Sequence, residues 1–231
     1  MRPVHRLLRV LLLAAGAVGS LVVSSRAPYG QEAAGIRGRV QIGIPIATRR
    51  PTTAYPTRSV PSPRLAAASE RRNVVVYLRN AQPQRIAPMR VAIRQRDELF
   101  TPRVVAVTVG SDVEFPNDDP IYHNVFSLSR AKNFNLGRYP RGETRRVRFD
   151  RPGVVKVFCE IHSHMSATVM VFDHPWFTVP NDAGAFELTG LPAGDRQVTA
   201  WHERLGDTTV DVRVELGRML QTDFILPVPE Q

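Results

Sequence analysis

Short apolar and β-branched runs, broken by proline, glycine and polar clusters, recur along the chain after about its first 33 residues. No long stretch repeats apolar positions at the spacing of an amphipathic helix. The pattern therefore predicts an all-β protein made of short strands. The predicted strands cover residues 38–42, 73–78, 91–94, 104–109, 111–115, 145–149, 154–159, 168–172, 185–188, 196–201, 208–215 and 221–226.

Turn and linker residues separate these strands. Residues 150–153 read Asp-Arg-Pro-Gly, which is turn chemistry because proline presets φ and glycine tolerates positive φ. We therefore expect a hairpin here, with Cys159 at the end of its return strand. Residues 45–72 are rich in proline, serine, threonine and arginine, and they predict a flexible, disordered loop.

The first 33 residues have the layout of a secretory signal peptide. Three arginines precede or interrupt an apolar run over residues 7–23, and small residues follow it. The alternative is an uncleaved membrane anchor, but Arg9 and several small residues interrupt the run. We expect a periplasmic or otherwise extracytoplasmic protein with no stable membrane insertion after cleavage. About 200 residues then remain, enough for one large domain or two small ones.

The net charge of +10 raises the question of a nucleic-acid partner. Residues 36–73 hold eight arginines against one glutamate, whereas residues 175–231 hold four arginines against nine acidic residues. The positive excess therefore belongs mostly to the signal segment and the linker. The sequence offers no stacking platform of aromatic and arginine side chains, so we predict no nucleic-acid binding. We expect these charges to act instead through local attraction between oppositely charged surfaces.

The candidate chemistry centres on Cys159, the one cysteine of the chain. A lone cysteine in an exported protein cannot form an internal disulfide. It opens the run Cys159-Glu160-Ile161-His162-Ser163-His164-Met165, downstream of an isolated His123. A thiolate, two imidazoles and a weak thioether are the ligand set of a blue-copper centre.

Cys159, His162 and Met165 at i, i+3 and i+6 would supply three ligands from one loop, and His123 from a neighbouring loop would complete the set. His164 could replace His162, although the i+3 position suits the loop better. The competing interpretation is a buried core thiol beside a packing methionine and unrelated histidines.

The segments "TPRVVAVTVGSDVEFPN", "HNV", "RRVRFDRPGVVKVFCEIHSHM" and "TVMVFD" resemble a complete cupredoxin domain with an amicyanin-like Cys-x-x-His-x-x-Met loop. The resemblance implies a Greek-key β-sandwich over residues 88–174 holding one type 1 copper. It implies His123, Cys159 and His162 as equatorial ligands and Met165 as the axial ligand. Asn124 would brace the cysteine loop by a hydrogen bond.

The same resemblance implies an electron-transfer surface around His162. Ile161 and Pro120 are the residues expected to flank that histidine, next to Met165. A surface of this kind should be small and weakly adhesive, so that redox partner proteins leave quickly.

The C-terminal segments "DAGAFELTGLPAG" and "VTAWHERLG" are similar to carboxypeptidase regulatory-like, transthyretin-like β-sandwich domains. Residues 175–228 lack the opening strands of such a domain, and residues 36–80 contain two strands that the cupredoxin does not need. We therefore expect these two segments to form one smaller β-sandwich, interrupted by the cupredoxin domain at 88–174.

The sequence predicts an exported carrier of single electrons between redox partner proteins, with a link to methylamine utilisation implied by the amicyanin resemblance. Copper enzymes of the oxidase or nitrite reductase type place a histidine beside the cysteine, but the neighbours here are Phe158 and Glu160. We expect no enzymatic activity. The alternatives are a copper-binding or copper-delivery protein, and a cell-envelope binding module without a redox role.

Overall fold

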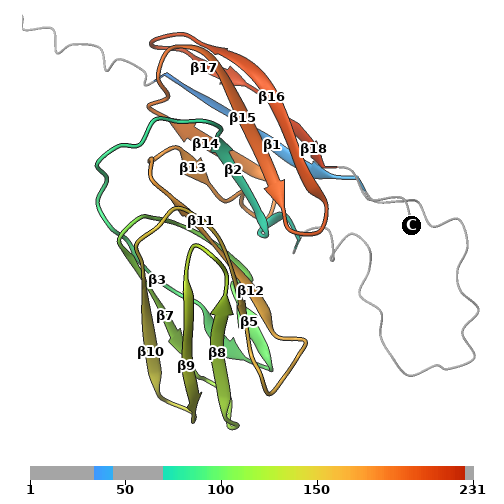
Figure 1. The fold of residues 1–231 in the computed structure, drawn as a ribbon. Helices are drawn as coiled ribbons and strands as arrows, with labels where there is room; N and C mark the ends of the chain where they lie inside the picture. Colours follow the sequence, from blue (N-terminus) through green and yellow to red (C-terminus); the bar gives the residue numbers. More distant parts are fainter. Residues whose placement is uncertain (1–33, 44–69, 227–231) are drawn as a thin grey trace, which may run out of the picture. The chain divides into compact units, whose positions relative to one another are not determined.

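The structure is a computed structural model that describes residues 34–43 and 70–226. In these residues the chain forms β-strands joined by turns and loops, so the all-β prediction is confirmed (Figure 1). The predicted signal peptide and residues 45–69 of the predicted loop lie outside the described residues. Within the described part, no helix is long and apolar enough to span a bilayer.

One set of strands, here called the site module, carries the predicted ligands. Its strands are β3 (Arg90–Ala92), β4 (Arg94–Arg96), β5 (Leu99–Thr101), β6 (Val104–Thr108), β7 (Ser111–Pro116), β8 (His123–Leu128), β9 (Asn133–Tyr139), β10 (Thr144–Phe149), β11 (Gly153–Phe158) and β12 (Ser166–Phe172). They form one sheet ordered β10-β7-β3, another ordered β6-β12-β11-β8-β9, and the β4–β5 hairpin.

The hydrophobic pattern explains how these strands enclose a core. Strand β7 alternates, so that Val113 and Phe115 are fully buried while Glu114 between them is partly exposed. Strand β12 is buried along nearly its whole length, and its residues 169–172 form a continuous apolar run. Such a run is expected of a strand covered on both faces. Cys159 and Met165 belong to the same core cluster.

A second set of strands, here called the flanking module, combines the two ends of the described chain. Its strands are β1 (Gly35–Ile42), β2 (Val74–Leu78), β13 (Phe177–Thr178), β14 (Ala185–Thr189), β15 (Gly194–His202), β16 (Gly206–Val214), β17 (Met219–Gln221) and β18 (Phe224–Leu226). One sheet is ordered β14-β1-β17, with β18 also paired to β1, and the other is ordered β13-β2-β15-β16.

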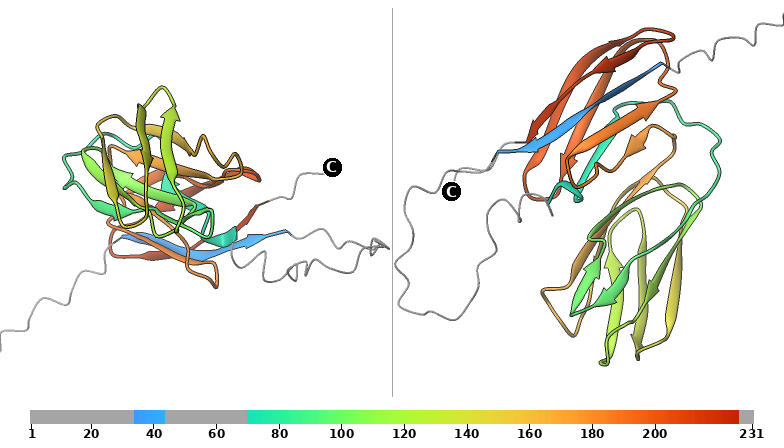
Figure 2. Two further views of the ribbon diagram at one scale, coloured as in Figure 1. Left: turned by 90° about the horizontal axis from the view of Figure 1, so that it is seen from below. Right: turned by 180° about the vertical axis from the view of Figure 1, so that it is seen from behind.

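The pairing of β1 and β2 joins distant parts of the sequence. Figure 2 shows β1, in blue, running beside the orange and red strands of the C-terminal segment. Strand β2 lies between β13 and β15, with Tyr77 opposite both Phe177 and Thr199. The flanking module has its own buried core, which includes Ile36 and Val198.

Several predicted elements differ in the structure. The expected hairpin at residues 150–153 is wrong, because β10 pairs with β7 whereas β11 pairs with β12 and β8. The turn is instead a corner at which the chain passes from one sheet to the other. The predicted strand 91–94 is divided between β3 and β4, which pair with different partners.

The predicted strand 221–226 is also divided, between β17 and β18. The backbone amide of Thr222 donates to the carbonyl of Arg37, and the carboxylate of Asp223 accepts from the backbone amide of Arg39. Both segments pair in parallel with β1 across this interruption. Gly38 is required opposite it, because a side chain there would collide with the backbone carbonyl of Thr222.

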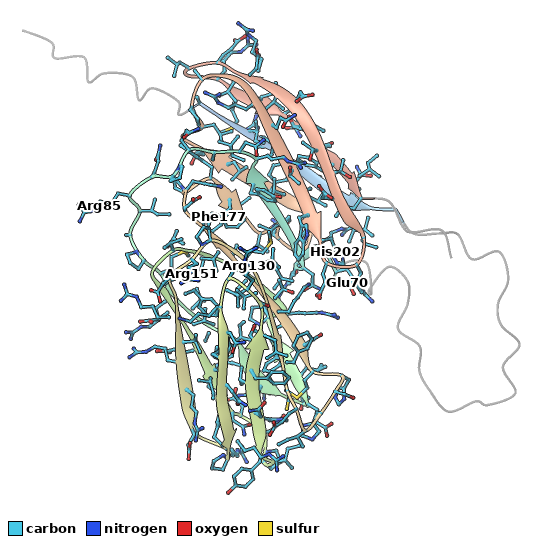
Figure 3. The ribbon with its side chains drawn as sticks, viewed as in Figure 1. Glu70, Arg85, Arg130, Arg151, Phe177 and His202 are labelled. Carbon is cyan, nitrogen blue, oxygen red and sulfur yellow. The ribbon has the colours of Figure 1, made fainter. Side chains whose placement is uncertain are left out.

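The last residues of the predicted loop, 70–72, are held by the flanking module. Glu70 lies beside the buried His202, as Figure 3 shows. Its Oε2 is 3.0 Å from Nε2 of that histidine. Glu70 also pairs with Arg204, and Arg72 pairs with Asp182. These contacts fix the chain just before β2 begins.

Candidate metal centre

Neighbouring strands bring the candidate ligands to one end of the site module. His123 is the first residue of β8, and Cys159 directly follows β11. These two strands are neighbours in the sheet, with Phe126 opposite Phe158. Strand β12 pairs antiparallel with β11, so residues 159–165 form the short connection between them. The expectation that His123 lies on a loop is corrected, because it belongs to a strand.

Three of the predicted ligands converge. The nearest donor atoms of His123, Cys159 and His162 all lie within 4.8 Å of one another. The Nδ1 atoms of the two histidines are 3.1 Å apart, and Cys159 Sγ is 3.9 Å from His162 Nδ1. A soft thiolate with two imidazoles suits copper, so the donor set fits the metal that the sequence suggests.

Hydrogen bonds within the connection hold its shape. The backbone amide of Cys159 donates to the carbonyl of Met165 over 3.3 Å, and the amide of Met165 donates to the carbonyl of His162 over 3.0 Å. The Asn124 carboxamide oxygen accepts a hydrogen bond from the backbone amide of Glu160 over 3.4 Å. This is the contact expected of Asn124 as a brace. Met165 is fully buried in the core that also contains Cys159.

The candidate ligands differ in their access to solvent. His123 and Cys159 are buried, whereas His162 is half-buried. Ile161 and Pro120 are both exposed, as the predicted surface requires. Sequence reasoning missed Ile121 and Tyr122, which are exposed immediately before His123. The sequence feature that could have identified them is their position directly before a predicted ligand.

His164 takes a different position from His162. Its side chain is exposed, and Nε2 lies 3.5 Å from a carboxylate oxygen of Glu98. Its ring centre is 6.1 Å from that of His162. The structure therefore groups His162, and not His164, with His123 and Cys159.

Asp119 is the residue of the site that sequence reasoning missed. Its Oδ2 lies 2.7 Å from His123 Nε2, on the side of the ring away from His162. A carboxylate accepts hydrogen bonds, so Nε2 carries the proton and Nδ1 keeps a lone pair for a metal. The one signal in the sequence is an aspartate four residues before an isolated histidine.

No protein-family model matches the chain, and no curated protein matches its sequence. A copper-containing nitrite reductase from Thermus scotoductus SA-01 is similar in structure, with 25% identity and a TM-score of 0.36. That match covers 41% of this chain and 26% of the nitrite reductase, so the chain spans about a quarter of that protein.

Two smaller proteins are matched over almost their whole length. A purple cupredoxin from Nitrosopumilus maritimus is 24% identical, with a TM-score of 0.33, and the match covers 36% of this chain and 99% of that one. Amicyanin from Paracoccus versutus is 17% identical, with a TM-score of 0.34, and the match covers 42% of this chain and 97% of that one. Likeness at these scores assigns no role to the chain.

Proposed function

We propose that this protein is an exported, mononuclear type 1 copper protein that carries single electrons between redox partner proteins. The observation that supports the proposal best is the convergence of His123, Cys159 and His162 in one cluster, in which His123 and Cys159 are buried and His162 is half-buried. Met165 would be the fourth, axial ligand. The cluster is the one group of three or more histidine, cysteine or acidic residues with metal-binding geometry within residues 34–43 and 70–226.

The residues around the cluster would keep the ligands nearly still during electron exchange. When bound, copper would supply a one-electron couple between Cu(I) and Cu(II). His123 and Cys159 are held at the ends of paired strands, and Asn124 ties those strands to the ligand loop. A site that moves little needs little rearrangement when the charge of the metal changes.

The half-buried His162 would be the route to a partner. Exposed apolar side chains lie beside the ligands in the sequence, at Ile161, Ile121 and Tyr122. An electron carrier benefits from a small contact surface, because a large one would slow the release of the partner. We propose that these residues, with Pro120, form that surface.

We further propose that the protein has no enzymatic activity of its own and acts outside the cytoplasm, in methylamine utilisation. Phe158 and Glu160 flank Cys159, so the chain has no adjacent histidine to couple the site to a second copper. A copper-delivery protein is the second candidate function, because the half-buried His162 could also pass the metal to an acceptor.

Copper loading of the full mature chain tests the proposal. The wild type with Cu(II) should give an intense blue thiolate-to-copper absorption band, and Cys159→Ser should abolish it. Ser163→Ala is the matched control, because Ser163 is an exposed residue of the same loop that the proposal does not use. A colourless Cu(II) complex of the wild type would overturn the proposal.

Voltammetry distinguishes the two candidate functions. An electron carrier should show a reversible wave with fast exchange and should keep its copper through both oxidation states. A delivery protein should lose copper to a chelator or to an acceptor protein when the metal is reduced. Cu(I) retention against a competing chelator therefore separates the two.

A further inference from the structure

The carboxylate of Asp119 receives three donors. It accepts hydrogen bonds from the backbone amide of Asp97 over 2.6 Å and from that of Glu98 over 3.0 Å. The third donor is His123 Nε2, at 2.7 Å. Asp119 is buried, with 5% of its surface exposed. The backbone amide of Asp119 donates to the side-chain oxygen of Asn117, and this hydrogen bond fixes the position of the Asp119 backbone.

Asp119 carries its negative charge in this environment. Both carboxylate oxygens accept hydrogen bonds, Oδ1 from the amide of Asp97 and Oδ2 from the amide of Glu98 and from His123, and a group that faces only donors is a carboxylate. The neighbouring Asp118 differs, since its carboxylate is more exposed and pairs with Arg94 at 3.0 Å. Asp119 is therefore the acidic group placed against a candidate ligand.

We propose that Asp119 is a positioning residue that fixes the tautomer of His123 and makes the site favour Cu(II) over Cu(I). The inference rests on the proposed copper site. A carboxylate bonded to the outer nitrogen of a ligand histidine orients the ring and raises its basicity. A more basic ligand beside a buried negative charge stabilises the more highly charged metal ion. The reduction potential is therefore lower than it would be without Asp119.

The Asp119→Asn variant replaces an acceptor-only group with one that is half donor. Oδ2 of Asp119 serves both His123 and Glu98, while Oδ1 serves Asp97. An asparagine amide cannot accept on both sides, so at least one of the three donors loses its acceptor. If the amide nitrogen faces His123, Nε2 must accept, and the proton then moves to the metal-binding nitrogen.

Redox titration and copper affinity of the full chain test the inference. Asp119→Asn should weaken Cu(II) binding about tenfold relative to Cu(I), within the range seen when such partners are removed. A tenfold change in that ratio raises a one-electron potential by about 59 mV. Asp118→Asn, the matched control, removes a charge one residue away and should leave the potential and the affinity ratio unchanged. Equal potentials in wild type and Asp119→Asn would overturn the inference.

A second measurement does not depend on the variant folding or on electron transfer. Nitrogen-15 NMR of the wild-type apoprotein should show His123 protonated at Nε2, with a slowly exchanging proton. Protonation at Nδ1 would refute the tautomer assignment. A wild type that fails to turn blue contradicts the proposed function, whereas a blue wild type whose potential ignores Asp119 contradicts this inference alone.

Discussion

Asn117 holds the segment that leads into the candidate metal centre, and Asn117→Ala should remove that support. The side chain is fully buried. Its amide nitrogen donates to the carbonyl of Ile121 over 2.9 Å and to that of Tyr139 over 3.1 Å. Its oxygen accepts from the backbone amide of Asp119 over 3.0 Å. Alanine keeps the backbone and loses all three bonds.

The loss of folding stability in Asn117→Ala follows from these three hydrogen bonds. A buried hydrogen bond contributes about 1 kcal/mol net, so three bonds give about 3 kcal/mol. The carbonyl of Tyr139 and the amide of Asp119 belong to buried residues, so water does not readily replace the lost partner. For a chain of this size, such a loss lowers the unfolding temperature by roughly 6–12 °C.

Thermal unfolding of the reduced apoprotein, followed by circular dichroism, measures the effect. Hydrogen exchange resolved by peptide then locates it, and protection should fall between residues 115 and 128. Asn133→Ala is the control, because Asn133 is exposed and its side chain forms no hydrogen bond within the described residues. The control should change stability by less than about 0.5 kcal/mol. If Asn117→Ala costs less than about 1 kcal/mol, the side chain does not hold this segment.

Four further predictions concern the site and the modules. Ile161→Glu should slow electron self-exchange severalfold and leave the absorption spectrum intact, because it places a charge in the contact surface. Met165→Leu should keep the blue band and raise the potential, since a weak axial thioether is lost. Burial lowers the pKa of His174 below its ordinary 6.5, so the unfolded chain binds a proton that the folded chain lacks, and stability should fall as pH drops below about 6.5. A fragment of residues 88–174 should bind copper alone, whereas a fragment of residues 175–231 should remain unfolded.

Each of these predictions has a contrary outcome. Leu128→Glu, an exposed change at the far end of β8, is the control for Ile161→Glu, and equal rates in both would place electron entry elsewhere. Loss of the blue band in Met165→Leu would show that the methionine shapes the site and not only its potential. His174→Asn should flatten the pH dependence measured by urea unfolding, and an unchanged slope would exclude His174 as its source. A fragment 88–174 without copper affinity would refute an independent copper domain.

The spacing of residues in the sequence was enough to predict the candidate ligands that lie on one loop. Cys159, His162 and Met165 share one short connection, so the sequence alone places them near each other. His123 is 36 residues upstream of the cysteine, and only the pairing of β8 with β11 brings it close. The spacing of Asp119 four residues before His123 does not by itself distinguish it from Asp118, because the direction of each side chain depends on how the segment before β8 folds back.

The sequence pattern did not predict strands β8 and β9, and this failure has a physical reason as well. Strands β8 and β9 contain several asparagine, serine and charged residues, and their pairing is irregular between Asn124 and Phe126. A bulge interrupts the alternation on which strand prediction depends. The turn at residues 150–153 was recognisable, but turn chemistry does not tell whether the flanking strands pair with each other. Sheet membership is decided by packing over long sequence distances.

The order of strand pairing affects how the chain folds as it emerges during synthesis. Residue 35 in β1 pairs with residue 189, and residue 78 in β2 pairs with residue 198. A chain that emerges from its N-terminus can complete the site module while β1 and β2 still lack partners. Unpaired strands can associate with other chains. Chains that stop before β14 and β15 would therefore keep the ligand-bearing strands and yet be prone to aggregation, because β1 and β2 would have no partners.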